Sequence, residues 1–202
     1  NKSNEEIKME KKKIAVTGGI GSGKSTVAEY IREEGFPVFS CDQINAELWQ
    51  NKEYLDGIEK IFPELGEPDK KRIAERVFSD KDALGRLNAY AHPKIMDELK
   101  RRMEETDSSL VFAEVPLLFE GGYERDFDKT VIVLRKEDFR IAAAASRDGL
   151  PPESIRSRIE NQFAYDRLLP ADNRIFLEND GSLADLKRKV RLLLTSLGKK
   201  NL

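Results

Sequence analysis

The chain has few of the residues from which covalent cross-links and metal sites are built. Its 202 residues include a single cysteine, Cys41, and a single histidine, His92. One cysteine cannot form a disulfide within the chain or supply a cysteine-built zinc site. One histidine likewise excludes a histidine-rich metal site. The fold must therefore come from packing, which a chain of this length can achieve without such supports.

The sequence also lacks long apolar runs and an excess of charge of one sign. No run approaches the roughly 18 apolar residues that span a bilayer, and no apolar signal-type stretch follows the polar N-terminus. The 35 basic and 37 acidic residues give a formal net charge of -2, so no basic field supports nucleic-acid binding. We expect a soluble, cytoplasmic protein that binds neither membrane nor nucleic acid. Residues 1–12 are predicted to be a disordered N-terminal extension.

One short segment combines glycines with a lysine at a specific spacing. Gly18 to Ser25 reads Gly-Gly-Ile-Gly-Ser-Gly-Lys-Ser and matches the pattern G-x-x-x-x-G-K-[ST] at every fixed position. Apolar Ile14–Thr17 predicts a strand before it, and Thr26–Glu34 predicts a helix after it. Glycines let the backbone wrap closely around phosphate, and a helix N-terminus favours anions. The segment therefore predicts a nucleoside triphosphate site.

Each polar residue of this loop has an expected role. Lys24 reaches the β- and γ-phosphates, and the Ser25 hydroxyl coordinates Mg²⁺. The expected nucleotide contacts come from Gly19, Ile20, Gly21, Ser22, Gly23, Lys24, Ser25 and Thr26.

Strands and helices alternate along much of the remaining chain. Further strands are predicted at Pro37–Ser40, Leu110–Glu114, Thr130–Leu134 and Arg174–Leu177. Helices are predicted from Asp42 onward and over Leu183–Leu197. This alternation is typical of an α/β fold, a doubly wound, five-stranded parallel sheet flanked by helices. The nucleotide-binding core is expected at residues 13–50, 106–135 and 172–202.

Two helical blocks interrupt the alternation. Residues 51–105 are predicted to form an inserted lobe, in which His92-Pro93 ends one helix and begins the next. Residues 136–171 carry several arginines, and Gly149-Leu150-Pro151-Pro152 divides them into two helices. We expect a lid that closes over the phosphates, although a solvated helical hairpin would show the same mixture of acids and bases.

Two acidic residues follow predicted strands, where ligands of open α/β sheets gather. Asp42, just past the second strand, is either a base toward an acceptor hydroxyl or only the N-cap of the following helix. Glu114, which closes the third strand, either lies near magnesium, directly or through water, or is an ordinary surface acid.

The loop alone does not distinguish kinases from other nucleotide-binding proteins. A GTPase needs D-x-x-G after a strand, but Asp82-Ala83-Leu84-Gly85 lies in helical sequence. Asn51-Lys52-Glu53-Tyr54 lacks the aspartate of a guanine-reading N-K-x-D. A small-molecule kinase fits better, because it explains an acceptor-side acid and an arginine-bearing lid. Another small-molecule or nucleoside monophosphate kinase, and a nucleotide-binding regulatory protein, stay as alternatives.

From Lys13 to about Leu197 the chain resembles the dephospho-CoA kinase family. The segments that carry the resemblance are Thr17–Ala28, Val77-Phe78, His92–Ile95, Pro116–Glu120, Arg147–Leu150, Gln162, Ala171-Asp172 and Asn179–Gly181. The resemblance implies a P-loop kinase fold with a helical CoA-substrate lobe at 51–105 and a lid at 136–171. It implies transfer of the ATP γ-phosphoryl to the 3′-hydroxyl of the ribose of dephospho-CoA, the last step of coenzyme A synthesis.

The resemblance also implies roles for single residues. Asp42 becomes the catalytic base, Arg147 a lid arginine that contacts ATP and stabilises charge, and Asn179 and Gly181 lie near the adenine. ATP, Mg²⁺ and dephospho-CoA are the implied ligands of a monomer or weak homo-oligomer.

The chain departs from the family pattern at several positions. The usual Asp-Ala-Asp after the second strand is Ser40-Cys41-Asp42 here, Glu114 stands where Asp is frequent, and Lys70 replaces an arginine common in the substrate lobe. Ala143 stands where many members have a first lid arginine, and Arg140 is the nearest arginine, one turn away.

Overall fold

The computed structural model describes residues 10–198. The predicted disordered extension falls mostly on residues 1–9, outside the described residues. Lys12, which was expected in that extension, is the first residue of strand β1.

The chain divides into two compact units. The first contains the described residues up to Val38 and from Thr106 onward, and the second is Phe39–Glu105. The second unit covers the lobe expected at 51–105 and also includes helix α2, Cys41–Leu48.

Five parallel strands form one sheet, in the order β2-β3-β1-β4-β5. Their bounds are β1 Lys12–Gly18, β2 Val38–Ser40, β3 Leu110–Glu114, β4 Lys129–Leu134 and β5 Arg174–Glu178. The central strand β1 pairs with β3 and with β4, so Ala15 lies between Ala113 and Thr130. Apolar residues on both faces of β1 suit a parallel sheet covered on both sides. The five-stranded parallel sheet expected from the sequence is confirmed.

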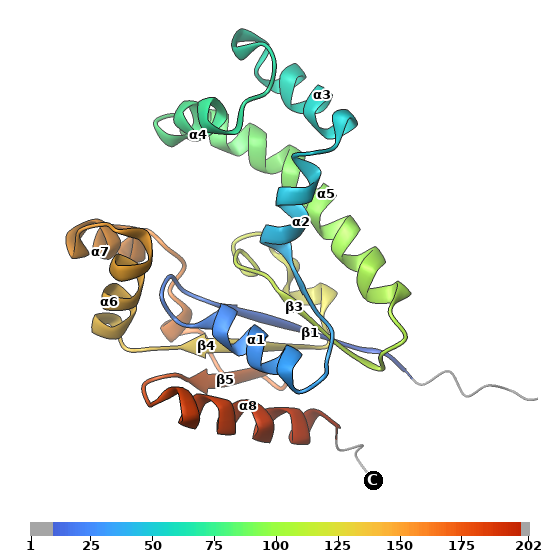
Figure 1. Cartoon of the computed structure of the whole chain (residues 1–202), viewed down its shortest axis with the longest axis vertical. Helices are drawn as coiled ribbons and strands as arrows, with labels where there is room; N and C mark the ends of the chain where they lie inside the picture. Colours follow the sequence, from blue (N-terminus) through green and yellow to red (C-terminus); the bar gives the residue numbers. More distant parts are fainter. Residues whose placement is uncertain (1–9, 199–202) are drawn as a thin grey trace, which may run out of the picture. The chain divides into compact units, whose positions relative to one another are not determined.

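Two helices cover one face of this sheet. Helix α1, Lys24–Glu33, and helix α8, Leu183–Gly198, pack against each other on that face (Figure 1). Their buried residues, such as Ile31 and Val190, form one cluster with Val16, Val131 and other strand residues. Burying each such side chain contributes about 1.5–3 kcal/mol. This cluster fixes α1, and with it the loop that precedes α1.

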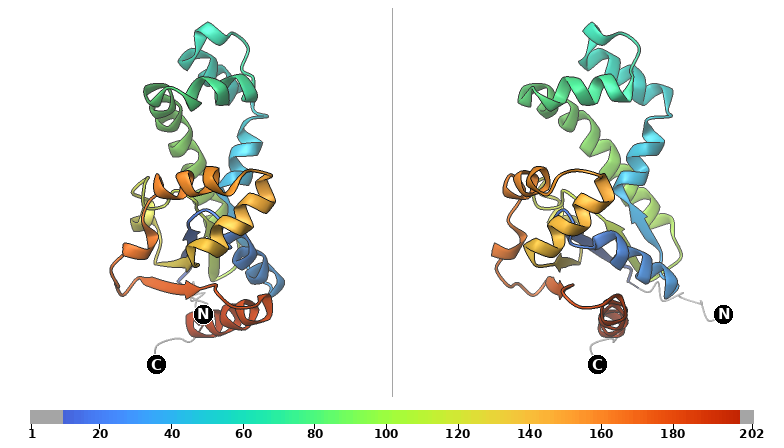
Figure 2. Two further views of the ribbon diagram at one scale, coloured as in Figure 1. Left: turned by 90° about the vertical axis from the view of Figure 1, so that its left-hand side faces the viewer. Right: turned by 60° about the vertical axis from the view of Figure 1, so that its left-hand side comes forward.

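Two further helices follow β4. They are α6, Glu137–Asp148, and α7, Pro152–Glu160, and Gly149 ends α6 in the left-handed conformation at φ 64°. Both views of Figure 2 show them beside the loop between β1 and α1. Buried Ile141, Ala144 and Ile155 form a small core of their own, against which Ile20 of the loop packs. The chain returns to β5 through the short 3-10 helix η3, Tyr165–Arg167.

The second unit is helical throughout its length after β2. Besides α2 it contains α3 Lys52–Ile61, the 3-10 helix η1 Pro63–Leu65, α4 Lys70–Phe78 and α5 Lys81–Glu105. Side-chain oxygens of Asn51 and Asp69 accept hydrogen bonds from the first turns of α3 and α4. Such caps stabilise a helix start by about 1 kcal/mol each. A cluster that includes Tyr54, Ile58 and Phe62 forms the core of this unit.

The predicted helix boundary at His92-Pro93 is wrong. Helix α5 runs without interruption from Lys81 to Glu105, with Pro93 inside it. Proline removes one backbone hydrogen bond and by itself disfavours a helix interior. Residues on both sides of Pro93 are buried, among them Ala91, Met96 and Leu99. Packing along the helix therefore outweighs the local cost of the proline.

Candidate active site

The glycine loop ends in a helix N-terminus that its own sequence leaves without a cap. Gly23 precedes α1 in the left-handed conformation at φ 95°, and no side chain caps the helix. The first turn contains no acidic residue. The first helical hydrogen bond is donated by Val27 N to Gly23 O, so the earlier amides point out of the helix end. This end carries a partial positive charge suited to an anion.

Three consecutive carbonyl groups of the loop accept hydrogen bonds from distant side chains. Ile20 O accepts from Arg140 Nε at 2.9 Å, Gly21 O from Arg135 Nη1 at 3.4 Å, and Ser22 O from Asn179 Nδ2 at 2.9 Å. We call Arg135, Arg140 and Asn179 the carbonyl brace. Ile20 N already donates to Gln162 Oε1, and Ser22 N donates to Gly19 O. Because the three carbonyls are bound on the outside, the N–H groups nearer the α1 N-terminus can face an anion on the inside.

The brace also constrains the loop sequence. A Cβ atom on Gly23 would lie 2.3 Å from Asn179 Nδ2, in addition to the strain of a positive φ. Asn179 is 7% exposed. The amide of Asn179, predicted to lie near an adenine, is therefore committed to the loop, and its contact with a base stays a prediction.

The two residues predicted to hold magnesium lie in direct contact. Ser25 Oγ, in the first turn of α1, donates a hydrogen bond of 2.6 Å to Glu114 Oε1. Glu114 closes β3 and is only 7% exposed, so it is not an ordinary surface acid. A hydroxyl and a buried carboxylate at the end of a phosphate loop are ligands that Mg²⁺ accepts.

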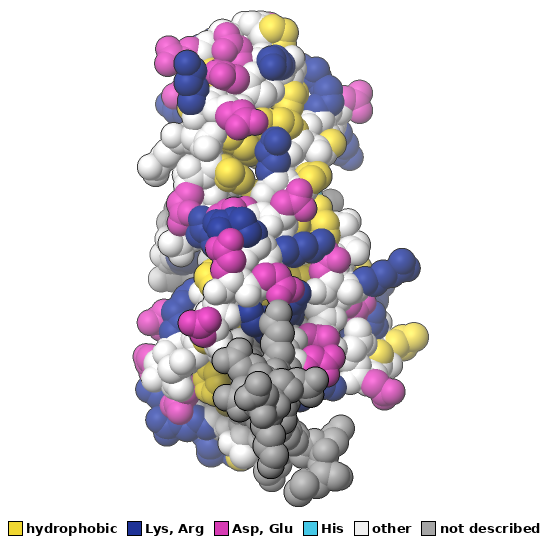
Figure 3. Space-filling view, turned by 90° about the vertical axis from the view of Figure 1, so that its right-hand side faces the viewer, with side chains coloured by type: hydrophobic (Ala, Val, Ile, Leu, Met, Phe, Trp, Pro, Cys, Tyr) yellow, Lys and Arg dark blue, Asp and Glu magenta, His cyan; other side chains and the backbone are white. Residues whose placement is uncertain are grey.

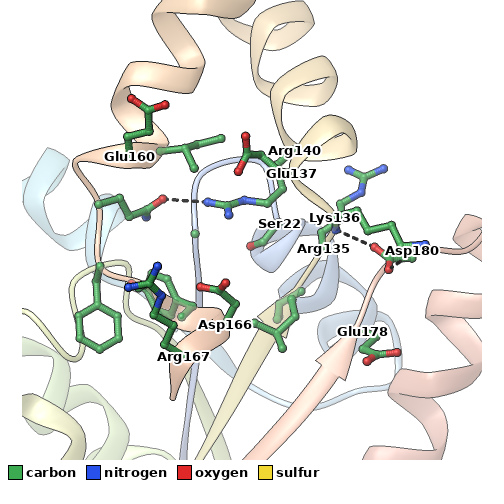
Figure 4. Close-up of a pocket in the computed structure, with 18 residues that line it drawn as sticks. Ser22, Arg135, Lys136, Glu137, Arg140, Glu160, Asp166, Arg167, Glu178 and Asp180 are labelled. Carbon is green, nitrogen blue, oxygen red and sulfur yellow. Dashed lines mark hydrogen bonds and ion pairs between the residues drawn. The ribbon is translucent and has the colours of Figure 1, made fainter. Parts of the chain in front are cut away.

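A cavity of about 510 Å³ opens beside the loop, between the ends of β4 and β5 and the helices α6 and α7. Figure 4 shows the residues that line it, among them Ser22, Arg140, Asp166 and Asp180. Asp180 Oδ1 accepts a hydrogen bond of 2.8 Å from Lys136 N, which ties the two strand ends together. Within the described part of the chain, the buried Ser22 Oγ has no hydrogen-bond partner. A polar ligand in the cavity could provide one.

A buried tyrosine anchors the segment that follows α7. Tyr165 Oη donates to Pro116 O at 3.0 Å and lies 3.3 Å from Glu120 Oε1. Its ring packs edge-on against Phe119 and Phe163. Burial raises the pKa of Tyr165 to about 12, so the hydroxyl stays protonated at neutral pH. The 3-10 helix η3 is thereby joined to the segment Pro116–Glu120.

Two arginines of α6, Arg140 and Arg147, lie in different surroundings. Arg147 is exposed, and its guanidinium binds the neighbouring Asp148, with Nε–Oδ1 at 2.6 Å and Nη2–Oδ2 at 3.0 Å. Arg140 is half-buried on the cavity wall, where burial lowers its pKa. No carboxylate forms an ion pair with Arg140 among residues 10–198. The predicted contact of Arg147 with ATP stays a prediction.

Asp42 lies in the second unit, in the first turn of α2. The N-cap of that helix is Ser40, whose Oγ accepts from Gln43 N, so Asp42 does not serve as the cap. Asp42 is exposed, and in the described part of the chain no side chain binds its carboxylate. The interpretation of Asp42 as a mere cap is therefore wrong, and its role as a base stays a prediction.

Other predicted residues occupy their expected elements. Lys24 is the first residue of α1, and Thr26 follows Ser25 in the same turn. Gly181 is exposed just before α8, and its predicted adenine contact stays a prediction.

Sequence reasoning missed Arg135 and Asp180 as loop and cavity residues. Each follows a strand of the sheet, Arg135 directly after β4 and Asp180 two residues after β5. Their place at carboxyl strand ends was a usable signal. Arg135 donates to Gly21 O of the loop, and Asp180 accepts from Lys136 N, beside Arg135. Neither contact could be predicted from local sequence.

Comparison with known proteins identifies the family of this chain. The family model described as "Dephospho-CoA kinase" matches residues 12–185. The chain belongs to the dephospho-CoA kinase family. A dephospho-CoA kinase of Thermus thermophilus is 36% identical, with 91% of each chain covered. One of Fusobacterium nucleatum is 34% identical, with 88% of this chain and 94% of the relative covered.

Solved structures agree with this family membership. A crystal structure of a Thermus thermophilus protein has a TM-score of 0.79 at 35% identity, covering 94% of this chain and 100% of that one. Dephospho-CoA kinase from Campylobacter jejuni has a TM-score of 0.69 at 25% identity, covering 94% and 98%. A shikimate kinase from Bacteroides thetaiotaomicron, at 16% identity and a TM-score of 0.55, shares the fold. This family member is therefore built on a P-loop kinase fold.

Proposed function

We propose that this chain transfers the γ-phosphoryl group of ATP to the 3′-hydroxyl of the ribose of dephospho-CoA, completing coenzyme A. The observation that carries the proposal is an intact phosphate loop within a chain that matches the family over residues 12–185. The relatives of Thermus and Fusobacterium carry the name of this activity.

The phosphate side of the site consists of the loop and α1. We propose that the loop amides and the α1 N-terminus bind the phosphate oxygens, with Lys24 reaching the β- and γ-phosphates. The carbonyl brace supports this role, because it holds the loop before the nucleotide arrives. Preorganised dipoles stabilise developing charge without rearranging during the reaction.

Magnesium is proposed to bind at Ser25 and Glu114. Residues 10–198 contain no cluster of three acidic, histidine or cysteine side chains that could hold a metal ion alone. A hydroxyl and one carboxylate fit Mg²⁺, which usually keeps waters and phosphate oxygens as its other ligands. When bound, the ion would neutralise charge on the transferred phosphoryl group.

The acceptor side is proposed to centre on Asp42. An exposed carboxylate without a side-chain partner in the described residues is suited to accept the proton of a substrate hydroxyl. We propose that residues 51–105 bind dephospho-CoA and that residues 136–171 act as a lid, which excludes water from the phosphoryl group. Arg147 then contacts ATP after leaving Asp148, while Asn179 and Gly181 flank the adenine.

The remaining expectations concern the location of the enzyme and its partners. In the described residues no helix is long and apolar enough to cross a bilayer. On the face shown in Figure 3, basic and acidic side chains are intermixed, and their numbers in the whole sequence are nearly equal, 35 and 37. A cytoplasmic location, a monomer or weak homo-oligomer and the absence of nucleic-acid binding remain predictions.

A panel of acceptors tests the proposal. Purified protein with ATP and Mg²⁺ is offered dephospho-CoA, adenosine and nucleoside monophosphates, and the phosphorylated products are identified by mass. We expect phosphorylation of dephospho-CoA at the 3′-hydroxyl. Transfer to another acceptor in its place would assign the scaffold to a different kinase. Nucleotide binding without transfer to any acceptor would favour a regulatory protein.

A further inference from the structure

Two lid residues hold the single peptide unit at the tip of the phosphate loop. Gln162 Oε1 accepts a hydrogen bond of 2.9 Å from Ile20 N. Arg140 Nε donates to Ile20 O at 2.9 Å. The ring is closed by a third bond of 3.0 Å, from Arg140 Nη2 to Gln162 Oε1, which is the dashed line that ends on Arg140 in Figure 4. The tip residue is therefore held through both its N–H and its C=O.

The loop sequence makes room for this arrangement. A Cβ atom at Gly19 would lie 2.3 Å from Arg140 Nη2 and 3.0 Å from Gln162 Oε1. A side chain at this position would therefore displace the ends of Arg140 and Gln162 from the Ile20 peptide. The Ile20 side chain adds an apolar contact, since it packs against the lid core of Ile141, Ala144 and Ile155.

The side chains of Arg140 and Gln162 have the donors and the acceptor needed to hold the Ile20 peptide. The planar guanidinium offers several donors in a fixed fork, so one Arg140 can reach Ile20 O and Gln162 Oε1 together. Gln162 contributes as an acceptor, because both of these bonds end on its Oε1. The two residues come from different lid segments: Arg140 lies in α6, and Gln162 follows α7. The arrangement therefore exists only when both lid segments are in place.

We propose that Arg140 and Gln162 are positioning residues that clasp the Ile20 peptide and so fix the phosphate loop for nucleotide binding. The clasp acts on ATP through the loop and not through contact with the reacting atoms. It rests on the proposed binding of ATP to this loop. It differs from the role predicted for Arg147, which requires direct contact with the nucleotide.

The test is a double-mutant cycle on MgATP affinity, measured by calorimetry without acceptor. Gln162→Met and Arg140→Gln each remove two of the three bonds, and we expect each to weaken MgATP binding roughly 5- to 30-fold. The double variant should bind MgATP no more weakly than the weaker-binding single variant, because either change alone opens the ring of hydrogen bonds. Arg156→Gln, on the exposed face of α7, is the matched control and should bind MgATP normally.

A second readout separates positioning from general loss of structure. In ¹⁵N spectra, the Ile20 amide should shift and exchange faster in Gln162→Met and in the shorter Gln162→Asn, while amides of Val131 and Val133 in the sheet core stay unchanged. Wild-type MgATP affinity in both single variants would overturn the proposal, as would additive losses in the double variant. Because no acceptor is present, the result stands even if dephospho-CoA is not the substrate.

Discussion

At the scale of single residues, Asp42 combines exposure with a carboxylate that no side chain binds in the described part of the chain. We expect Asp42→Asn to retain MgATP binding and to lower turnover of dephospho-CoA by about 10²–10⁴-fold, as for other general bases. The low end is favoured because phosphoryl transfer has a loose transition state. Steady-state kinetics with calorimetry of MgATP binding provide the measurement. Near-normal turnover would remove Asp42 from the mechanism, since Ser40 already caps α2.

Glu114 is the second residue whose charge can be tested alone. Glu114→Gln keeps the shape of the side chain and an acceptor for Ser25 Oγ, but it removes the negative charge. We expect the Mg²⁺ concentration for half-maximal activity to rise about 10–100-fold, as when a metal site loses a supporting group. Titration of activity with Mg²⁺ measures it.

The matched control for this change is Glu153→Gln, on the exposed face of α7. Its Mg²⁺ dependence should equal that of the wild type. If Glu114→Gln also leaves the dependence unchanged, the pair of Ser25 and Glu114 does not hold the ion.

At the scale of secondary-structure elements, an ion-pair network joins α2 to α5. Arg102 bonds both Glu47 of α2 and Glu98 of its own helix, and Arg101 also bonds Glu98. Hydrogen bonds from Arg101 and Arg102 lower the pKa of Glu98 from 4.5 to about 2. The charged form is thus favoured in the folded state. Its contribution to stability is complete above about pH 4.5 and is lost as the pH falls toward 2.

The network predicts a pH-dependent difference between two proteins. We expect Glu98→Gln to be less stable than the wild type at pH 7, and the difference in the free energy of unfolding to shrink as the pH falls from 4.5 toward 2. Urea unfolding at pH 7, 4 and 3 measures it. Glu75→Gln, an exposed change on α4, serves as control and should show no such convergence. A difference that stays constant with pH would mean that Glu98 stabilises through packing alone.

Local sequence predicted most elements because their signals are local. The strand Leu110–Glu114, the glycine loop and the break at Gly149 follow from apolar runs and glycine positions, and all lie where expected. Helix α5 is the exception, because burial on both sides of Pro93 decides it, and burial depends on residues far away in sequence. The cap of α2 was misassigned by two residues, since Ser40 and Asp42 are both good caps and only the backbone conformation at Ser40 decides.

The candidate site was predictable only in part, for the same reason. Lys24, Ser25 and Glu114 were found because a motif and a strand end mark them. The bonds from the brace and the clasp to the loop join residues more than 110 positions apart, as in the bond from Arg140 to Ile20. No local pattern contains such a pairing. The sequence also does not predict that Arg147 binds Asp148. A guanidinium can bind either a neighbouring carboxylate or a ligand, and the sequence does not decide between the two.

At the scale of the whole molecule, nucleotide binding should raise the stability of the fold. A ligand that binds only the folded state contributes about 2.7 kcal/mol when present at 100 times its Kd. For a chain of this size that corresponds to a rise in Tm of roughly 5 °C or more. Differential scanning fluorimetry with and without MgATP measures the rise. Lys24→Ala should fold but lose it, and an equal rise in that variant would place the nucleotide elsewhere.

The carbonyl brace has a consequence for how the protein is made. Asn179 lies 157 residues after Ser22, whose carbonyl it binds, and Arg135 and Arg140 are also distant from the loop. During translation the complete glycine motif leaves the ribosome well before the side chains that hold its carbonyls. A nascent chain arrested before β5 thus carries the motif without its full support, and we expect it to capture ATP poorly. Nucleotide capture then becomes a mark of a chain that has been synthesised past Asn179.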